Sequence, residues 1–154
     1  MTGKDTKSYM SAFSFIVSFK RPFNLEDSGW QEVSGLMSEL SVEEYKEGGE
    51  NGFVWKLPKE AKYKNIVLKR AMESHSLDSD LMKWVKGALE DFIFKPGDMT
   101  ISIVDENIKP LRTWNVTGVY PVKMESSSLH ANKNELAIET IELAYRSFKV
   151  ENDT

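Results

Sequence analysis

The stretch AFSFIVSFK, residues 12–20, decides the fold class because its side chains alternate with a period of two. One set is apolar and mostly aromatic, and the other mixes Ser and Lys with a single Ile: Phe13, Phe15, Val17 and Phe19 against Ser14, Ile16, Ser18 and Lys20. Successive side chains of a strand point to opposite faces of a sheet. The stretch therefore predicts a strand with one strongly buried face, which Arg21-Pro22 ends.

Most of the chain repeats this extended pattern. Residues 24–29 read as a loop. Further strands are predicted at 31–44, where Ser34-Gly35 indicates a bend or bulge, at 53–57, which Pro58 ends, and at 66–70. The strands predicted at 99–104 and 111–116 form a hairpin around 105–107, and two more strands are predicted at 119–124 and 135–150. Residues 59–65 look charged and irregular, and residues 126–134 look like a polar loop. The last strand shifts its apolar phase between Ile138 and Ile141, which indicates either a bulge or burial on both faces.

One helix interrupts the strands. An apolar stripe at the helical period is formed by Leu77, Leu81, Trp84, Val85, Ala88, Leu89 and Phe92. Asp78 or Ser79 is suited to cap its first turn, and Lys95-Pro96-Gly97-Asp98 ends it. The opposite face is charged and should meet water. A single amphipathic helix in a strand-rich chain is expected to cover one side of a sheet.

Length and composition bound the class of protein. A chain of 154 residues with 40% hydrophobic residues fits one domain, which should remove roughly 70% of its unfolded surface on folding. No cysteine is present, so disulfides and thiolate chemistry are excluded. The net charge of −4 argues against a protein whose main task is to wrap nucleic acid.

The chain divides into a flexible N-terminal arm at 1–11, a single domain at 12–150 and a short tail at 151–154. The fold class is α+β and mainly antiparallel β. No stretch is apolar enough to cross a bilayer, and the first residues do not resemble a secretory signal. We expect a protein that is made in the cytoplasm without a signal peptide.

No motif indicates catalysis, a cofactor or a metal ion. His75 and His130 lie far apart in polar segments and are expected to be solvated. The run Gly48-Gly49-Glu50-Asn51-Gly52 lacks the Lys-Ser/Thr ending of a phosphate-binding loop. Adjacent acids such as Glu43-Glu44 point to opposite faces of a strand. These observations favour a binding or structural protein over an enzyme.

The tryptophans leave one alternative open. Trp84 belongs to the helix stripe, while Trp55 and Trp114 fall in strands and are expected to pack. If Trp30 and Trp55 were exposed instead, the domain would suit a monomeric β-sandwich module that binds carbohydrate or a small ligand.

Several segments, in order, resemble the contractile phage tail tube protein family. They are Gln31-Glu32-Val33-Ser34-Gly35-Leu36, Tyr45-Lys46-Glu47-Gly48-Gly49-Glu50-Asn51, Leu57-Pro58, residues 63–70, Trp114-Asn115-Val116, Tyr120-Pro121-Val122-Lys123 and residues 137–145. Lys46 stands where the family has arginine, and Ala71 stands where it often has glycine. The resemblance covers residues 13–148.

This resemblance implies the architecture and the function. Members of the family fold as two packed β-sheets, sandwich- or barrel-like, with one flanking α-helix, and form stacked hexameric rings that make a rigid tube inside a contractile sheath. Type VI secretion tube proteins are more distant relatives. The implied partners are further copies, the sheath, baseplate or hub and tube-terminating proteins, and cargo or DNA in the lumen. The implied location is a virion tail or a released injection particle.

Two sets of residues are candidates for assembly. The loop implied to contact the neighbouring ring consists of Tyr45, Lys46, Glu47, Gly48, Gly49, Glu50, Asn51, Gly52 and Phe53. A lumen that lets cargo slide should be polar and preferably acidic, which makes Glu135, Glu139 and Glu142 candidates for its wall. Solvated charges on an outer face are an equally good reading of these three glutamates.

Overall fold

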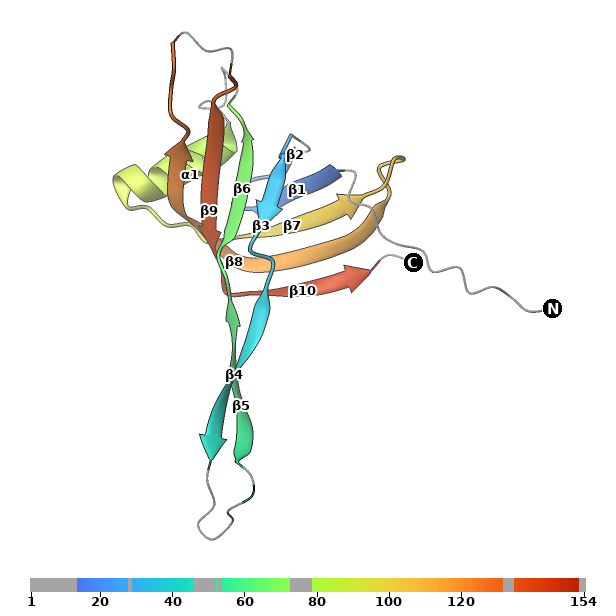
Figure 1. Cartoon of the computed structure of the whole chain (residues 1–154). Coiled ribbons are helices and arrows are strands. Elements are labelled where there is room, and N and C mark those ends of the chain that lie inside the picture. Colours follow the sequence, from blue (N-terminus) through green and yellow to red (C-terminus); the bar gives the residue numbers. More distant parts are fainter. Residues whose placement is uncertain are drawn as a thin grey trace, which may run out of the picture.

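The computed structural model describes residues 14–27, 29–45, 52, 54–72, 79–131 and 135–152. The predicted arm at 1–11 lies outside these residues, and so do residues 153–154 of the predicted tail. The described elements form a mainly antiparallel α+β fold with two sheets and one helix (Figure 1): β1 Ser14–Arg21, β2 Leu25–Asp27, β3 Glu32–Ser34, β4 Ser38–Tyr45, β5 Trp55–Tyr63, β6 Ile66–Ala71, α1 Asp80–Asp91, β7 Gly97–Val104, β8 Pro110–Ser126, β9 Ile138–Ala144 and β10 Ser147–Asn152.

Sheet I has the strand order β2–β1–β7–β8–β10, with antiparallel neighbours. Its centre is the β7–β8 hairpin, which confirms the predicted pairing of 99–104 with 111–116. The Asp105 carboxylate accepts hydrogen bonds from the backbone N–H groups of Asn107 and Lys109 and so holds the turn. Residues 24–29 are not wholly a loop, because β2 forms there on the edge of β1.

Sheet II has the order β3–β6–β9–β8, again antiparallel, and the long strand β8 belongs to both sheets. β8 changes sheet at Gly118, whose φ of 68° is in the left-handed region. Opposite this bend the chain breaks at Tyr145 and Arg146, so residues 135–150 form two strands and not the single strand expected. Within β9 buried and partly buried residues alternate and the register with β6 has no shift, so Ile138 and Ile141 lie on opposite faces of a regular strand, and neither a bulge in β9 nor burial on both faces explains the shifted apolar phase.

The core lies between the two sheets and α1. Its fully buried members come from both sheets and the helix: Val17, Ile66, Leu68, Leu81, Met82, Val85, Ile141 and Leu143. Ser79 caps α1, as one of the two predicted alternatives, by accepting a hydrogen bond from the Met82 N–H over 3.2 Å. Trp84 is confirmed as a core residue, and its indole N–H donates to the Lys95 carbonyl at 2.8 Å.

The predicted helix stripe is wrong in its last turn. The side chain of Leu89 is 41% exposed and that of Phe92 is 82% exposed. The helix ends at Asp91, and Phe92 takes the left-handed conformation at the cap, which turns its ring away from the core. Leu77 lies outside the described residues.

The strands β4 and β5 form a two-stranded hairpin that projects from the end of sheet II (Figure 1). The expectation that Pro58 ends a strand and that 59–65 is irregular is wrong, because β5 runs from Trp55 to Tyr63. The register shifts between Leu40 and Val42, beside the pair Val42–Pro58. A proline is tolerated next to such a bulge in an exposed ribbon, where its missing N–H breaks no essential ladder bond.

The bend predicted at Ser34-Gly35 separates β3 from β4 and depends on glycine. Gly35 has a φ of 88°, and a Cβ there would overlap the carbonyl oxygen of Asn65. We expect Gly35→Ala to lower the free energy of unfolding by about 2 kcal/mol or more. Gly87→Ala is the matched control, because a Cβ at Gly87 meets nothing within 4 Å and should stabilise α1 by about 0.5–1 kcal/mol. Denaturant unfolding followed by tryptophan fluorescence measures both, and equal stability of the two variants would contradict the expectation.

Candidate assembly surfaces

Sheet II has one buried face and one polar face. The buried face carries Ile66, Leu68, Ile141 and Leu143. The cross-strand register places the other side chains together on the opposite face, which we call the polar face: Glu32, Ser34, Val67, Lys69, Ala71, Tyr120, Lys123, Glu125, Ile138, Thr140, Glu142 and Ala144. None of these side chains is buried. The chain therefore leaves this face uncovered, as far as the described residues show.

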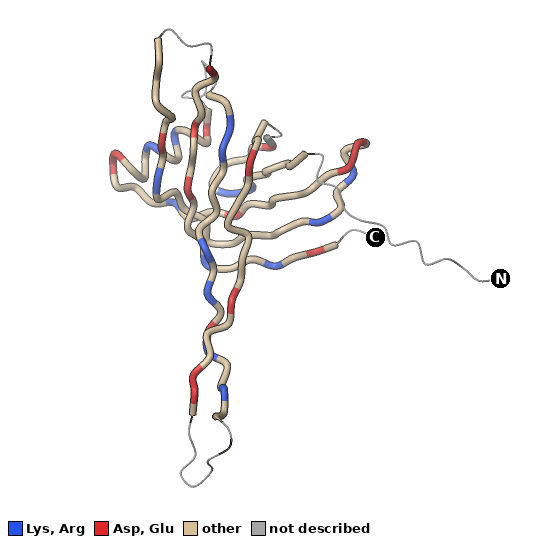
Figure 2. Tube along the Cα trace, viewed as in Figure 1, with Lys and Arg blue, Asp and Glu red and all other residues tan. Residues whose placement is uncertain are grey.

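Charges on the polar face are mixed in sign. Lys69 Nζ lies 3.8 Å from Glu32 Oε2, and Lys123 Nζ lies 3.4 Å from Glu125 Oε2. Glu142 makes no ion pair with a described residue, although its strand neighbour in the register is Lys123. Figure 2 shows acidic and basic residues interspersed along the strands of the molecule. Such exposed pairs add about 0–1 kcal/mol each to stability, so their main effect is on the charge of the surface.

Sheet II also has two strand edges without a partner among the described residues. The second half of β8, residues 120–126, pairs with β9 on one side only, because β7 ends its pairing at Val119. On the opposite side of the sheet, β3 pairs only with β6, and β4 continues this edge while pairing only with β5. Unpaired edges of this length are templates for another strand.

The β4–β5 hairpin exposes large apolar side chains along its length: Leu40, Val42, Tyr45, Val54, Trp55 and Leu57. Of the predicted ring-contact loop, Tyr45 and Gly52 are described and both are exposed. Lys46, Glu47, Gly48, Gly49, Glu50, Asn51 and Phe53 lie outside the described residues. An isolated two-stranded hairpin is marginally stable in water, so apolar side chains on it indicate a surface that a partner covers.

Glu139 is not on the polar face. Its side chain is buried with 3% exposure, and its carboxylate accepts a hydrogen bond of 3.1 Å from the Arg70 guanidinium. Arg70 also stacks over the ring of Trp30, with 4.4 Å from Cζ to the ring centroid. The register pairs Arg70 with Glu139 on the buried side of β6 and β9, which corrects the expectation that Glu139 lines a lumen. Glu135 and Glu142 remain candidates.

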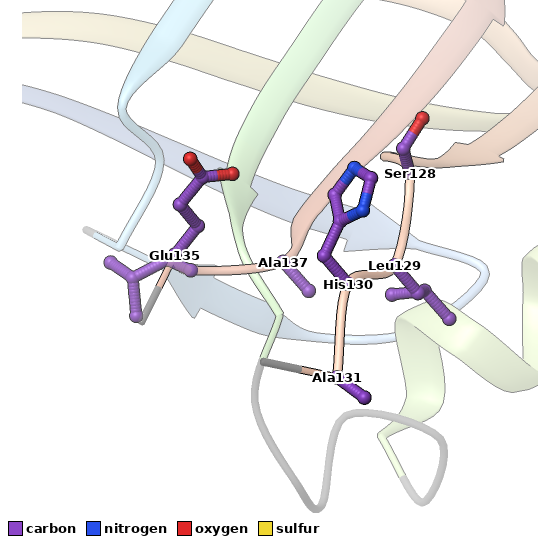
Figure 3. A pocket seen from close by; sticks show the side chains of 7 residues that line it. Ser128, Leu129, His130, Ala131, Glu135 and Ala137 are labelled. Carbon is purple, nitrogen blue, oxygen red and sulfur yellow. The ribbon is translucent and has the colours of Figure 1, made fainter. Parts of the chain in front are cut away.

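Glu135 lies in the segment that leads into β9, beyond the strands of sheet II. It borders an open pocket of about 310 Å³ together with Ser128, Leu129, His130 and Leu136 (Figure 3). His130 and Glu135 are both exposed, and so are the apolar side chains of Leu129 and Leu136. The segment thus presents a mixed surface at the end of the sheet.

An aromatic cluster of Tyr63, Tyr145 and Phe148 joins the root of the hairpin to the bend between β9 and β10, with ring centroids 5.2–6.0 Å apart. The Tyr145 hydroxyl is buried and has no hydrogen-bond partner among the described residues. Burial, and secondarily the charge of a nearby ionised Tyr63, raise the pKa of Tyr145 to about 12.

This raised pKa predicts an alkaline weakening of the fold. The folded state holds the Tyr145 proton more tightly than the unfolded state, whose pKa is 10.0. The stability linked to this group is therefore complete below pH 10 and is lost as the pH rises toward 12. Tyr145→Phe should remove the last-titrating tyrosine from an absorbance titration and flatten the loss of stability in that range. A variant whose titration and alkaline stability match those of the parent chain would contradict this assignment.

The tryptophans do not form a ligand surface. Trp30 is 4% exposed and lies beneath Arg70, so the interpretation of an exposed Trp30 is wrong. Trp114 packs against the core, whereas Trp55 is half exposed on the projecting hairpin.

No helix among the described residues is long and apolar enough to cross a membrane.

The edges, the uncovered face and the hairpin define a subunit built for assembly with other chains, and comparison with known proteins gives its class. A model of the T4-like virus tail tube protein gp19 family matches residues 11–149. A search of curated proteins gave no match. The chain belongs to this tail tube family and is a structural subunit of the inner tube of a contractile tail or injection system.

Solved structures agree with this assignment. The chain is similar to a protein in the 6-fold symmetrised baseplate of the anti-feeding prophage, with 25% identity, a TM-score of 0.83 and coverage of 95% of this chain and 97% of that chain. It has the same fold as a chain of the PVC sheath–tube complex, with 24% identity, a TM-score of 0.79 and coverage of 96% and 95%. Hcp1 from Flavobacterium johnsoniae shares the fold more distantly, with 16% identity, a TM-score of 0.56 and coverage of 92% and 97%.

Sequence reasoning missed most of the polar face and the apolar end of α1. Lys69 and Lys123 come close to Glu142 only through the register of β6, β8 and β9, which the sequence does not show. The helical spacing places Phe92 in the buried stripe, whereas the run Phe92-Ile93-Phe94 directly before Lys95-Pro96-Gly97 is the signal that apolar residues continue beyond the helix end.

Proposed function

We propose that six copies of this chain close into a ring, and that the rings stack into a rigid conduit for cargo or DNA. The observation that carries the proposal is the pair of free edges on opposite sides of sheet II. A head-to-tail contact between unlike edges generates a ring when the rotation closes. The number six is taken from the similar chain in the 6-fold symmetrised baseplate of the anti-feeding prophage.

The strand directions favour this closure. β3, β6, β9 and β8 alternate in direction across the sheet. When β8 of one copy meets β3 of the next around a symmetric ring, these two strands also run antiparallel. The alternation then continues through every junction, so that the sheets join into one barrel without an open edge.

In such a barrel the polar face lines the lumen. The core, α1 and sheet I all lie on the other face of sheet II, and their bulk fits only on the outside of a closed ring. The wall then carries Glu142 together with the Lys69–Glu32 and Lys123–Glu125 pairs. Glu135 lies toward the rim of the ring, in the segment before β9.

The projecting hairpin supplies the contact between rings in this proposal. Its end carries the Gly-rich loop from Tyr45 to Phe53, and the hairpin extends beyond the body of the subunit (Figure 1). By analogy with the complexes in which the similar chains occur, the outer surface would meet a contractile sheath, and the ends of the tube would meet baseplate and terminating proteins.

Replacement of Gly48 and Gly49 by leucine tests the role of the loop. Bulky residues are expected to remove conformations that only glycine adopts and so to leave folded monomers or single rings that fail to stack. Negative-stain microscopy and light scattering measure the outcome, with Gly87→Ala as the control that should still form tubes. Tubes of normal length from the double variant would contradict the ring-contact role of the loop.

A further inference from the structure

The end of α1 carries an exposed apolar surface for which the ring closure proposed above names no partner. We call it the aromatic patch: Leu89, Phe92, Ile93, Phe94 and Tyr120. Phe92 is 82% exposed, Ile93 53% and Phe94 43%. Exposed apolar surface of this kind marks a contact with another molecule more often than a free surface.

The patch is held in a fixed shape. The rings of Phe92 and Phe94 meet edge to face with centroids 4.8 Å apart, and Phe94 meets Tyr120 in the same way at 6.1 Å. Ile93 donates its backbone N–H to the Gly87 carbonyl over 2.9 Å.

Phe92 is also strained. Its φ of 56° lies in the left-handed region, which bulky residues avoid. A glycine would suit this cap without strain, so the presence of an outward-facing phenylalanine indicates a function for the ring.

The patch is continuous with the free edge of β8. Tyr120 belongs to the patch and is also the first residue of β8 that pairs with β9 and lacks a partner on the other side. Any strand added to this edge must therefore pass beside Phe94. The segment that pairs with the free edge of β8 therefore also determines what contacts the aromatic patch.

At the opposite edge of sheet II, exposed apolar residues lie at about the same level along the strands as Tyr120. The register aligns Ser34 with Val67, Val67 with Glu142, and Ala144 with Tyr120. The chain that leaves β3 after Ser34 therefore enters β4 level with Tyr120 or slightly beyond it. There it exposes Met37 by 43% and Leu40 by 60%.

We propose that the aromatic patch of one copy receives the root of the β4–β5 hairpin of the next copy in the same ring, with Met37 and Leu40 packed against Phe94 and Phe92. This inference rests on the ring closure proposed above and names the side-chain contact that accompanies it. Apolar packing beside the paired edges fixes how far one subunit is shifted along the strands of the next. Backbone pairing alone would allow the two strands to slip by two residues.

The absence of cysteine from the chain allows a direct test by cross-linking. Leu40→Cys and Phe94→Cys are made in separate chains, mixed during assembly and oxidised. A disulfide-linked dimer is expected from the mixture and not from either variant alone, because the contact joins unlike surfaces. Leu40→Cys mixed with Val150→Cys, an exposed apolar position on β10, is the matched control and should not link.

Phe92→Gly separates assembly from folding. The substitution removes strain and the exposed ring together, so the subunit should unfold at a higher denaturant concentration than the parent chain. Assembly should require about tenfold more protein, because the apolar contact is lost. A merely structural role of Phe92 would instead lower stability and leave assembly unchanged.

The outcomes separate this inference from the proposed function. Rings that form normally while Leu40→Cys and Phe94→Cys fail to link, or while Phe94→Cys stays as reactive to a maleimide as in the free subunit, would overturn the inference and keep the ring. A parent chain that forms no ring at any concentration would overturn both.

Discussion

Replacement of Arg70 by methionine is expected to lower the free energy of unfolding by about 3–5 kcal/mol at neutral pH. The Glu139 carboxylate is 3% exposed, and Arg70 is the residue whose guanidinium donates to it. Without that partner the carboxylate would be a buried charge, and the stacking of Arg70 on Trp30 would be lost as well. Denaturant unfolding of the subunit measures the change.

The double variant Arg70→Met with Glu139→Leu is the control. A buried ion pair replaced on both sides by apolar residues of similar size costs little, so much of the stability should return. A single Arg70→Met variant within about 1 kcal/mol of the parent chain would show that the pair is solvated and would contradict the burial of Glu139.

A cysteine at Thr140 is expected to become protected from large reagents when the subunit assembles. Thr140 lies at the centre of the polar face, which the proposed barrel encloses. A small maleimide that enters the tube should label Thr140→Cys, whereas a maleimide on a long polymer should label it only in the free subunit. Lys83→Cys, on the exposed side of α1, should react with both reagents in both states.

The native chain has no cysteine, so each variant reports on one position. The polar face does not line the lumen if Thr140→Cys and Lys83→Cys are equally protected from the large reagent in tubes. Labelling of Thr140→Cys in tubes by the large reagent would lead to the same conclusion.

The local elements were largely predictable from the sequence. The alternation through Phe15, Val17 and Phe19 gives β1, and the glycine at position 35 marks the bend that separates β3 from β4. The helix and its Ser79 cap follow from spacing and hydrogen-bonding chemistry that act within a few residues. Such features need no knowledge of distant contacts.

The predictions that failed concern features that depend on contacts between residues far apart in the sequence. Glu139 looked like a surface acid, but the strand register places it opposite Arg70 on the buried face of sheet II. Pro58 looked like the end of a strand, but the bulged pairing with Val42 accommodates it. Phe92 fits the helical stripe by its spacing, but the helix ends one residue earlier. Register, bulges and caps depend on the assembled sheet, which a single sequence does not reveal.

The most direct test of the central claim is the size and shape of the purified protein across a concentration series, by light scattering together with electron microscopy. The account predicts rings that stack into tubes with an open lumen, and a reconstruction in which β8 of each copy runs antiparallel to β3 of the next around the inner wall. A species that stays at 17.6 kDa at every concentration, or a ring whose lumen is lined by α1, would contradict it.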